Sequence, residues 1–173
     1  MVDDAAREQF QGWDMSMREK VTFMLEREGW AMDAVRARTD LDPPMPSYSY
    51  TIGFEEKFAF PEVCIFGLTP VACRGLFGLI VEFLAGGTQL PVDAPFMGVL
   101  DGGQPSAFLT VDAASSVGMF PALAEHHTLA GDAPDGFRMV QFAWPDPQGN
   151  LPWEPNFAVE LAPVQLLLGD PPA

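Results

Sequence analysis

Carboxylates supply most of the reactive side chains in this sequence. Twelve Asp and Glu residues follow Lys57, against two arginines and no lysine in the same stretch. A pair such as Glu62 and Asp146 could act as general acid and general base. The sequence does not set the distance between two carboxyl groups, on which glycoside hydrolysis for example depends. The carboxylates therefore permit a metal-independent hydrolase without defining one.

The histidines and cysteines are poorly placed for metal binding. Adjacent side chains such as His126 and His127 diverge on a helix and point to opposite faces of a strand, so they do not readily chelate one ion. We expect both at a solvated helix end, where the helix dipole favours the positive form. Cys64 and Cys73 lie within apolar runs and lack C-x-x-C spacing. We therefore expect two buried free thiols and no metal site.

Several motifs of catalysis and nucleotide binding are absent. Trp144-Pro145-Asp146 matches the acid-bearing loop of tyrosine phosphatases, whose chemistry also needs a cysteine with an arginine six positions later. Pro70 stands at that distance from Cys64, and Leu79 from Cys73. The chain also has no G-x-S-x-G, G-x-x-x-x-G-K-[ST] or G-x-G-x-x-G motif. The phosphatase chemistry is thus excluded, and no cofactor is predicted.

The stretch QFAWPDPQGNLPWEPNF, residues 141–157, combines stiff and bulky residues around one turn. Asp146 to Gly149 fits a type I turn followed by a left-handed glycine, a common three-residue hairpin loop. Such a hairpin would pair Trp144 with Pro152 at an edge of the sheet, because proline cannot donate to a ladder. Side chains alternate along a strand, so Trp144 and Trp153 are predicted to point to opposite faces.

Trp153 has two interpretations. It could pack under a second layer of the fold, as a buried tryptophan commonly does. It could instead form a rigid aromatic wall of a ligand pocket, suited to stacking on a glycan or a peptide. The residues proposed to bind a ligand in the second case are Trp153, Asp146, Glu154, Tyr50 and Glu62.

The elements that would position these residues are strands and helices in mixed order. Tyr48 to Phe54 reads as a strand with Tyr50, Ile52 and Phe54 on one face. Glu62 to Leu68 reads as a central strand, because its apolar residues do not alternate. The connection between the two strands is too short for a crossover helix, which predicts that they are antiparallel neighbours.

Capping signals mark two of the helices. Ser16 and Glu19 form a capping box before a helix over 16–28, and Thr69-Pro70 opens an apolar helix that ends at Gly86-Gly87. Further elements are expected as follows: a helix within residues 4–13 anchored by Phe10 and Trp13, a first strand at Trp30–Arg38, a hairpin of Met97–Leu100 with Ser106–Val111, a helix over 116–127, and a strand at Phe137–Trp144. The pattern predicts one α+β domain spanning 1–173. It has a mainly antiparallel sheet, about three helices, an N-terminal extension (1–15) and a C-terminal tail (158–173).

Charge and composition restrict the partners. The 173 residues carry a net charge of −15, which disfavours nucleic acids and anionic membranes alike. The start MVDDAAREQF lacks the pattern of a signal peptide, so we expect a cytoplasmic protein of bacterial type. The apolar helix after Thr69 is too short to span a bilayer and is expected in the core.

Five blocks of the chain together resemble one protein family. They are GW at 29–30, Pro43-Pro44, YTIGF at 50–54, PEVCIFGL at 61–68 and QFAWPDPQGNLPWE at 141–154. In order and combination they are similar to an uncharacterised bacterial family, domain-of-unknown-function family 4262, over residues 18–157. The resemblance implies a small stand-alone domain without an assigned activity. Members of that family commonly have a histidine where this chain has Phe60, so any chemistry of that histidine is lost here.

Two hypotheses about function follow. The preferred one is a non-catalytic module that binds a small molecule or a partner protein through the Trp153 face and the adjacent strand at 50–54. The alternative is an enzyme, either a metal-independent hydrolase or a flavin-dependent reductase on a small split-barrel-like sheet. The scarcity of basic residues disfavours flavin, whose phosphate needs a cation or a helix N-terminus.

Overall fold

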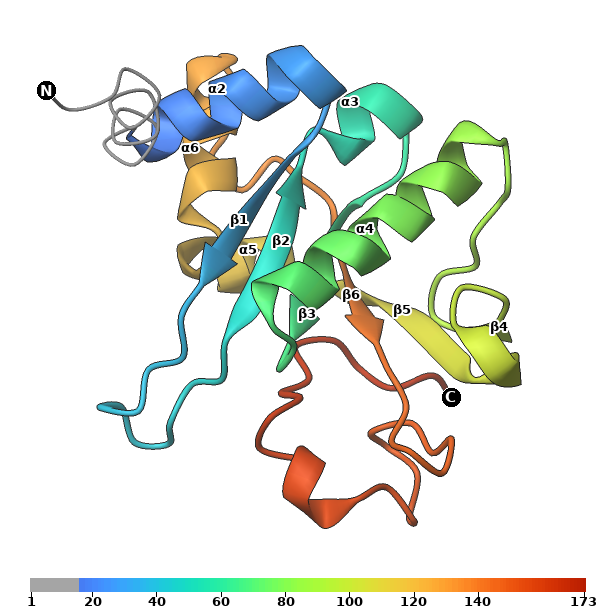
Figure 1. Cartoon of the computed structure of the whole chain (residues 1–173). Helices are drawn as coiled ribbons and strands as arrows, with labels where there is room; N and C mark the ends of the chain where they lie inside the picture. The colour runs from blue at the N-terminus through green and yellow to red at the C-terminus, as the bar shows by residue number, and fades with distance from the viewer. Residues whose placement is uncertain (1–15) are drawn as a thin grey trace, which may run out of the picture.

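The computed structural model describes residues 16–173. These residues form one six-stranded sheet with the strand order β1-β2-β3-β6-β5-β4 (Figure 1). The strands are β1 (Ala31–Val35), β2 (Tyr48–Ile52), β3 (Glu62–Phe66), β4 (Pro95–Met97), β5 (Pro105–Val111) and β6 (Met139–Ala143). Every neighbouring pair is antiparallel except β3 and β6, which are parallel. The predicted α+β class with a mainly antiparallel sheet is confirmed.

The helices lie on both sides of this sheet. They are α2 (Met17–Glu28), α3 (Phe54–Phe58), α4 (Pro70–Ala85), α5 (Ala113–Ser116) and α6 (Pro121–Leu129), with short 3-10 turns η1 (Asp101–Gly103), η2 (Val117–Met119) and η3 (Val159–Leu161). In Figure 1, α4 lies in front of the sheet and α6 behind it. No helix within residues 16–173 has both the length and the apolar character needed to cross a bilayer.

Local capping starts the two longest helices where the sequence predicts. Ser16 Oγ accepts the Glu19 amide at 3.2 Å, while the Glu19 carboxylate accepts the Ser16 amide at 2.7 Å. Thr69 Oγ1 accepts the Ala72 amide at 3.2 Å, and Pro70 is the first residue of α4. Both predicted helix starts are confirmed. The expected helix within 4–13, with its anchors, lies outside the described residues.

The core has one layer on each face of the sheet. On the α4 side, Cys73, Phe77 and Ile80 pack against alternate residues of β3, β5 and β6. On the other side, Leu123 of α6 and Val21 of α2 pack against the remaining residues of β2 and β3. All five residues of β3 are buried, as expected for a central strand. Cys64 and Cys73 are both buried and free, as predicted.

Three predicted elements need correction. The strand expected at Met97–Leu100 is instead β4 at Pro95–Met97, which still pairs antiparallel with β5. The strand that starts at Tyr48 ends at Ile52, because Gly53 adopts φ of 100° and Phe54 begins α3. Phe54 therefore packs on the α4 side of the sheet, opposite Tyr50 and Ile52. The strands β2 and β3 are still antiparallel neighbours, as predicted.

The helix predicted over 116–127 is divided in three. Residues 113–119 form α5 and η2, and α6 starts only at Pro121. Phe120, with φ of −124° and ψ of 58°, lies outside the helical region. Proline disfavours the helical conformation in the residue before it and supplies no amide donor, so Pro121 can open a helix but not continue one.

The C-terminal segment after residue 158 lies against the sheet and is held there by two glutamines. The side-chain amide of Gln141, buried within β6, donates to the Leu166 carbonyl at 2.6 Å and accepts the Leu168 amide at 2.7 Å. The side chain of Gln165 forms two further bonds to the backbone of Trp144, each 2.8 Å long. These four bonds fasten the C-terminal segment to β6 and to Trp144, the residue after it.

Candidate functional site

The turn at Asp146 has the predicted geometry. The Gly149 amide donates to the Asp146 carbonyl at 3.0 Å, and Gly149 has φ of 87°. The buried Asp146 carboxylate accepts the backbone amides of Gln148, Asn150 and Ala158 at 3.0, 2.9 and 2.9 Å. Burial by itself would raise the pKa of Asp146, but these bonds and the Asn150 side chain outweigh it, and the pKa lies below its usual value. Asp146 therefore organises its own loop.

The second strand of the predicted hairpin does not form. After Asn150 the chain runs into two consecutive turns, closed by bonds from the Glu154 amide to the Leu151 carbonyl and from the Phe157 amide to the Glu154 carbonyl. Trp144 pairs with the side chain of Gln165 instead of with Pro152. The predicted pairing was wrong because the amide of Gln165, distant in sequence, satisfies both backbone groups of Trp144.

The two tryptophans lie on opposite faces of the sheet, as predicted. Trp144 packs at the edge of the α4-side core and donates its indole N–H to the Phe66 carbonyl at 2.9 Å. Trp153 is partly buried against Ala107, Leu109 and Ala143 on the other face. The exposed Glu154 carboxylate accepts the Leu151 amide within the same turn. Much of Trp153 is thus packing for the C-terminal loops.

Tyr50 is enclosed by the core. Its hydroxyl donates to Asp33 Oδ2 at 2.6 Å and accepts the Ala122 amide at 3.0 Å, which ties β1 and β2 to the start of α6. Its side chain is fully buried. Burial first, and then the hydrogen bond to Asp33, raise the pKa of Tyr50. The geometry gives it a structural role with both hydroxyl bonds satisfied.

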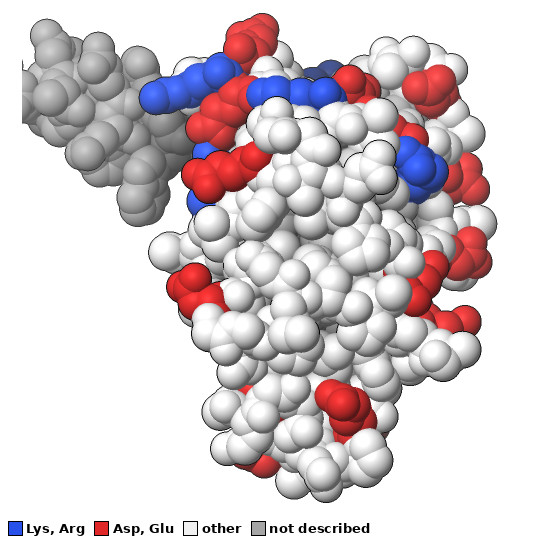
Figure 2. Space-filling view, turned by 90° about the vertical axis from the view of Figure 1, so that its right-hand side faces the viewer, with Lys and Arg blue, Asp and Glu red and all other residues white. Residues whose placement is uncertain are grey.

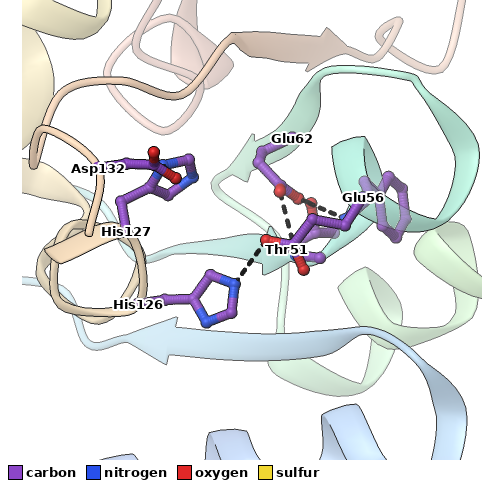
Figure 3. Close-up of polar contacts among 8 residues, drawn as sticks. Thr51, Glu56, Glu62, His126, His127 and Asp132 are labelled. Carbon is purple, nitrogen blue, oxygen red and sulfur yellow. Dashed lines mark hydrogen bonds and ion pairs between the residues drawn. The ribbon is translucent and has the colours of Figure 1, made fainter. Parts of the chain in front are cut away.

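Glu62, 2% exposed, caps α3 from the neighbouring strand. Gly53 has no side chain to cap this helix, and the Glu62 carboxylate accepts the amides of Gly53 and Phe54, each at 3.0 Å (Figure 3). It also accepts the Thr51 hydroxyl at 2.8 Å, and that hydroxyl oxygen accepts the Val63 amide at 2.9 Å. Burial raises the pKa of Glu62 to about 7, with the hydrogen bonds from Thr51, Phe54 and Gly53 acting in the opposite direction.

The histidines are less solvated than expected. In Figure 3 the His126 ring points from α6 toward Glu56, with Nε2 2.8 Å from the carboxylate Oε1. The two histidine side chains are 20% and 13% exposed, and the His127 ring packs against Phe137. The expectation of a solvated pair was wrong, because α6 turns these residues toward α3 and the core. Among residues 16–173 no cluster of His, Cys, Asp and Glu could hold a metal ion.

The structure does not gather the five predicted ligand-binding residues into one site. Glu62 pairs with Met139 at the start of two parallel strands, and Asp146 follows seven residues after Met139. At about 3.3 Å per residue the strand from Met139 to Ala143 spans about 13 Å, and Asp146 lies beyond its far end. The hypothesis of an acid–base pair formed by these two residues is therefore wrong. Trp153, Asp146 and Glu154 remain close in the same loops, whereas Tyr50 and Glu62 lie within the sheet.

A groove that sequence reasoning missed lies where β5 ends and β6 begins. Its volume is about 1160 Å³, and its walls include the segments before β3 and β4 and the C-terminal segment. Apolar side chains that line it include Phe60, Val92, Phe137, Leu168 and Pro171. No local motif marks this groove, because its walls come from five separate stretches of the chain. We call it the β5–β6 groove.

The charged residues of the β5–β6 groove are mainly acidic. Asp93 binds the Thr110 amide and hydroxyl at 2.8 and 2.7 Å, which fastens the segment before β4 to β5. Asp112 and Asp170 are exposed at the rim. Arg138 is the one cation among the lining residues, and it donates to Glu55 at 2.7 Å, so its charge is already paired. The groove therefore combines an apolar floor with a negative rim.

A shallower apolar groove of about 580 Å³ lies beside the Asp146 turn. Trp144, Leu68, Leu76 and Leu100 line it, and so does Asp146, whose carboxylate is occupied within the loop. The tryptophan beside this groove is therefore Trp144 and not Trp153. We call it the Trp144 groove.

No curated protein and no solved structure matches this chain. The family model described as domain of unknown function (DUF4262) matches residues 24–158. The matched region runs from within α2 to the loops after Trp153, so it includes all six strands of the sheet. The chain thus belongs to the family of domains of unknown function 4262.

Proposed function

We propose that this protein is a non-catalytic binding module that takes a small amphipathic molecule with a positively charged group into the β5–β6 groove. The observation that carries the proposal is an open groove of about 1160 Å³ with an apolar floor and acidic residues at its rim. Ligand pockets in proteins are commonly concave, mostly apolar and supplied with a few polar groups that orient the ligand. The groove has these properties.

The floor supports an apolar ligand body. Val92, 38% exposed, and the partly buried Leu90 and Leu168 present apolar surface in the groove, over a rigid floor formed by the nearly buried Phe60, Phe137 and Met139. Each square ångström of apolar surface removed from water contributes about 25 cal/mol. An aliphatic or aromatic group laid on these side chains would therefore supply most of the affinity.

The rim supports a cationic group. Asp112 and Asp170 are exposed, whereas the cation of Arg138 is paired with Glu55. The whole chain carries a net charge of −15, which adds a long-range field of the same sign. Phosphates, nucleotides and fatty acids would meet repulsion here, so an amine or quaternary ammonium compound is the better ligand class.

The carboxylates that could act as catalysts are occupied. The carboxylates of Glu62 and Asp146 both accept hydrogen bonds from backbone amides on both of their oxygens. Phe60 stands in the groove wall at the position where the family resemblance leads one to expect a histidine. These features favour binding over catalysis.

The surface of Trp153 and Glu154 is the second candidate for the same function. Trp153 keeps part of its ring accessible beside the exposed Glu154 carboxylate. Ligand binding by these two residues, together with Asp146, Tyr50 and Glu62, stays a prediction. It ranks second because three of the five are enclosed by internal hydrogen bonds.

The test uses three probes of equal chain length: octyltrimethylammonium, 1-octanol and octanoate. Binding is followed by NMR chemical-shift changes and calorimetry on the full chain. We expect octyltrimethylammonium to bind more tightly than 1-octanol and octanoate to bind worst, with shifts concentrated around the β5–β6 groove. Val92→Arg, which places a cation in the groove wall, should weaken the ammonium probe at least about tenfold, or 1.4 kcal/mol.

Val159→Arg is the matched control, because Val159 is exposed on η3 and does not line the groove. Equal loss of affinity in both variants would refute the groove as the site. Octanoate binding as tightly as the ammonium probe would refute the ligand class. Shifts confined to the surroundings of Trp153 would move the site to the second candidate.

A further inference from the structure

The outer face of α4 is apolar and is not covered by any other described part of the chain. Val71 is 83% exposed and Leu79 is 40% exposed, while the opposite face of the helix packs on the sheet. In Figure 1, α4 lies in front of the sheet, and no other element of residues 16–173 lies over its outer side. Contiguous apolar patches commonly mark contact surfaces, and Val71 and Leu79 lie about two turns apart on one face of α4 with the small Gly75 between them.

Two glycines within α4 are not explained by the monomer. A Cβ atom added to Gly75 or to Gly78 would meet nothing within 4 Å. Glycine in a helix interior weakens the helix relative to alanine, so internal packing offers no reason for either residue. Close approach of another helix backbone does offer a reason, because a side chain at these positions would hold the two helices apart.

The residues of this face are self-complementary about Gly75. When two copies of α4 pack antiparallel with Gly75 at the two-fold axis, Val71 of each copy lies opposite Leu79 of the other. In the same register Ala72 lies opposite Gly78. Large side chains thus meet large ones outside a centre of small residues. This is the property required of a two-fold interface, in which one patch binds its own copy.

The scarcity of charge on this face permits the approach of a second copy. Two chains that each carry −15 repel each other, so they can approach only where carboxylates are sparse. From Pro70 to Val81 the only charged residue is Arg74, which pairs with Glu28 and covers the Trp30 ring at 4.5 Å. Figure 2 shows the side of the molecule that lies at the right in Figure 1. Charged side chains lie along the edges of that side, and few lie in its middle.

The one carboxylate on the outer face of α4 has a favourable place in this register. Glu82 is exposed and, with Gly75 at the axis, lies opposite Leu68 of the other copy, one residue before that helix is capped by Thr69. The N-terminus of a helix carries a partial positive charge that attracts carboxylates. Each Glu82 would therefore face the positive end of the opposite α4.

We propose that this protein forms a two-fold dimer through antiparallel packing of α4 on its copy, centred on Gly75. The Trp144 groove, which Leu68 lines from just before α4 and Leu76 from the N-terminal half of α4, continues the apolar surface beside the axis. The proposal is independent of ligand binding, since the β5–β6 groove is lined by other elements.

The test measures the mass of the full chain by sedimentation equilibrium over micromolar to millimolar concentrations. We expect the wild type to dimerise and Gly75→Glu to remain monomeric throughout. The new side chain has open space in the monomer, so the melting temperature should not fall. Thr22→Glu, on the exposed side of α2, is the matched control and should dimerise like the wild type.

Cross-linking distinguishes this interface from any other. Gly75→Cys places two thiols at the two-fold axis, and mild oxidation should join them into a covalent dimer. The native cysteines are buried, so they should not form competing cross-links. Thr22→Cys should cross-link far more slowly. A monomeric wild type at all concentrations would overturn the proposal. So would a dimer that persists in Gly75→Glu and does not cross-link through Gly75→Cys.

Discussion

Replacement of Glu62 by glutamine tests how a buried carboxylate is held at the start of α3. Burial raises the pKa of Glu62 from its ordinary 4.5 to about 7. The folded protein therefore keeps the proton in a pH range in which the unfolded chain has lost it. Stability falls as pH rises through this range, because the native state binds more protons there.

The size of the effect follows from the shift. A change from 4.5 to about 7 is about 2.5 pH units, and at 1.36 kcal/mol per unit it corresponds to about 3 kcal/mol. This contribution is present below pH 4.5 and lost above about pH 7 to 8. Glutamine does not titrate, so Glu62→Gln lacks the slope. The side-chain NH2 group of glutamine also faces the Gly53 N–H, so two donors meet there. This contact changes the free energy of unfolding of the variant by the same amount at every pH.

The assay is urea unfolding of the wild type and of Glu62→Gln at intervals between pH 4.5 and 8.5. The free energy of unfolding of the variant minus that of the wild type should rise by about 3 kcal/mol across this range. Glu26→Gln removes an exposed carboxylate from α2 and serves as the control. The carbon-13 titration of the Glu62 carboxyl group should show its midpoint near pH 7.

A difference between wild type and variant that stays constant over the whole range would refute the reasoning. A difference that falls with rising pH would refute it more strongly. In that case the three hydrogen bonds from Thr51, Gly53 and Phe54 would stabilise the charged form by more than burial destabilises it.

Three further substitutions test the structural roles of buried polar and aromatic residues by urea unfolding. Gln165→Ala leaves the backbone amide and carbonyl of Trp144 without partners and should cost about 1–3 kcal/mol; no loss would show that water replaces the glutamine. Tyr50→Phe removes the hydroxyl that donates to the buried Asp33 and should cost about 1–3 kcal/mol; an unchanged stability would show that this hydrogen bond does not stabilise the fold. Trp153→Ala should cost about 2 kcal/mol, less than a fully buried tryptophan; a shift of a few tenths would instead favour a ligand-binding role for the ring.

Signals confined to a few neighbouring residues were readable from the sequence. The starts of α2 and α4 depend on Ser16 with Glu19 and on Thr69 with Pro70, and the Asp146 turn depends on four consecutive residues. Trp144 and Trp153 also lie on opposite faces, as predicted, although the second strand on which that prediction was based does not form. The two helix starts and the Asp146 turn are each set by contacts within one turn.

Features that depend on distant residues were not readable. Glu62 caps α3 across strands, and Gln165 takes the place of a strand partner for Trp144 although 21 residues separate them. Because no sequence rule links such positions, the prediction of a hairpin strand after Asn150 failed. The prediction of one helix over 116–127 failed for a local reason, because a new helix, α6, begins at Pro121.

The sequence by itself determined the class of the fold, the acidic surface, the buried thiols and the absence of familiar catalytic motifs, since these depend on composition, periodicity and short-range geometry. Only the tertiary structure decided which side chains share a site. It separated Glu62 from Asp146 at opposite ends of parallel strands, and it formed the β5–β6 groove from five segments of the chain. The physical reason is that a groove is a relation among surfaces, and those surfaces meet only when the sheet has brought distant segments together.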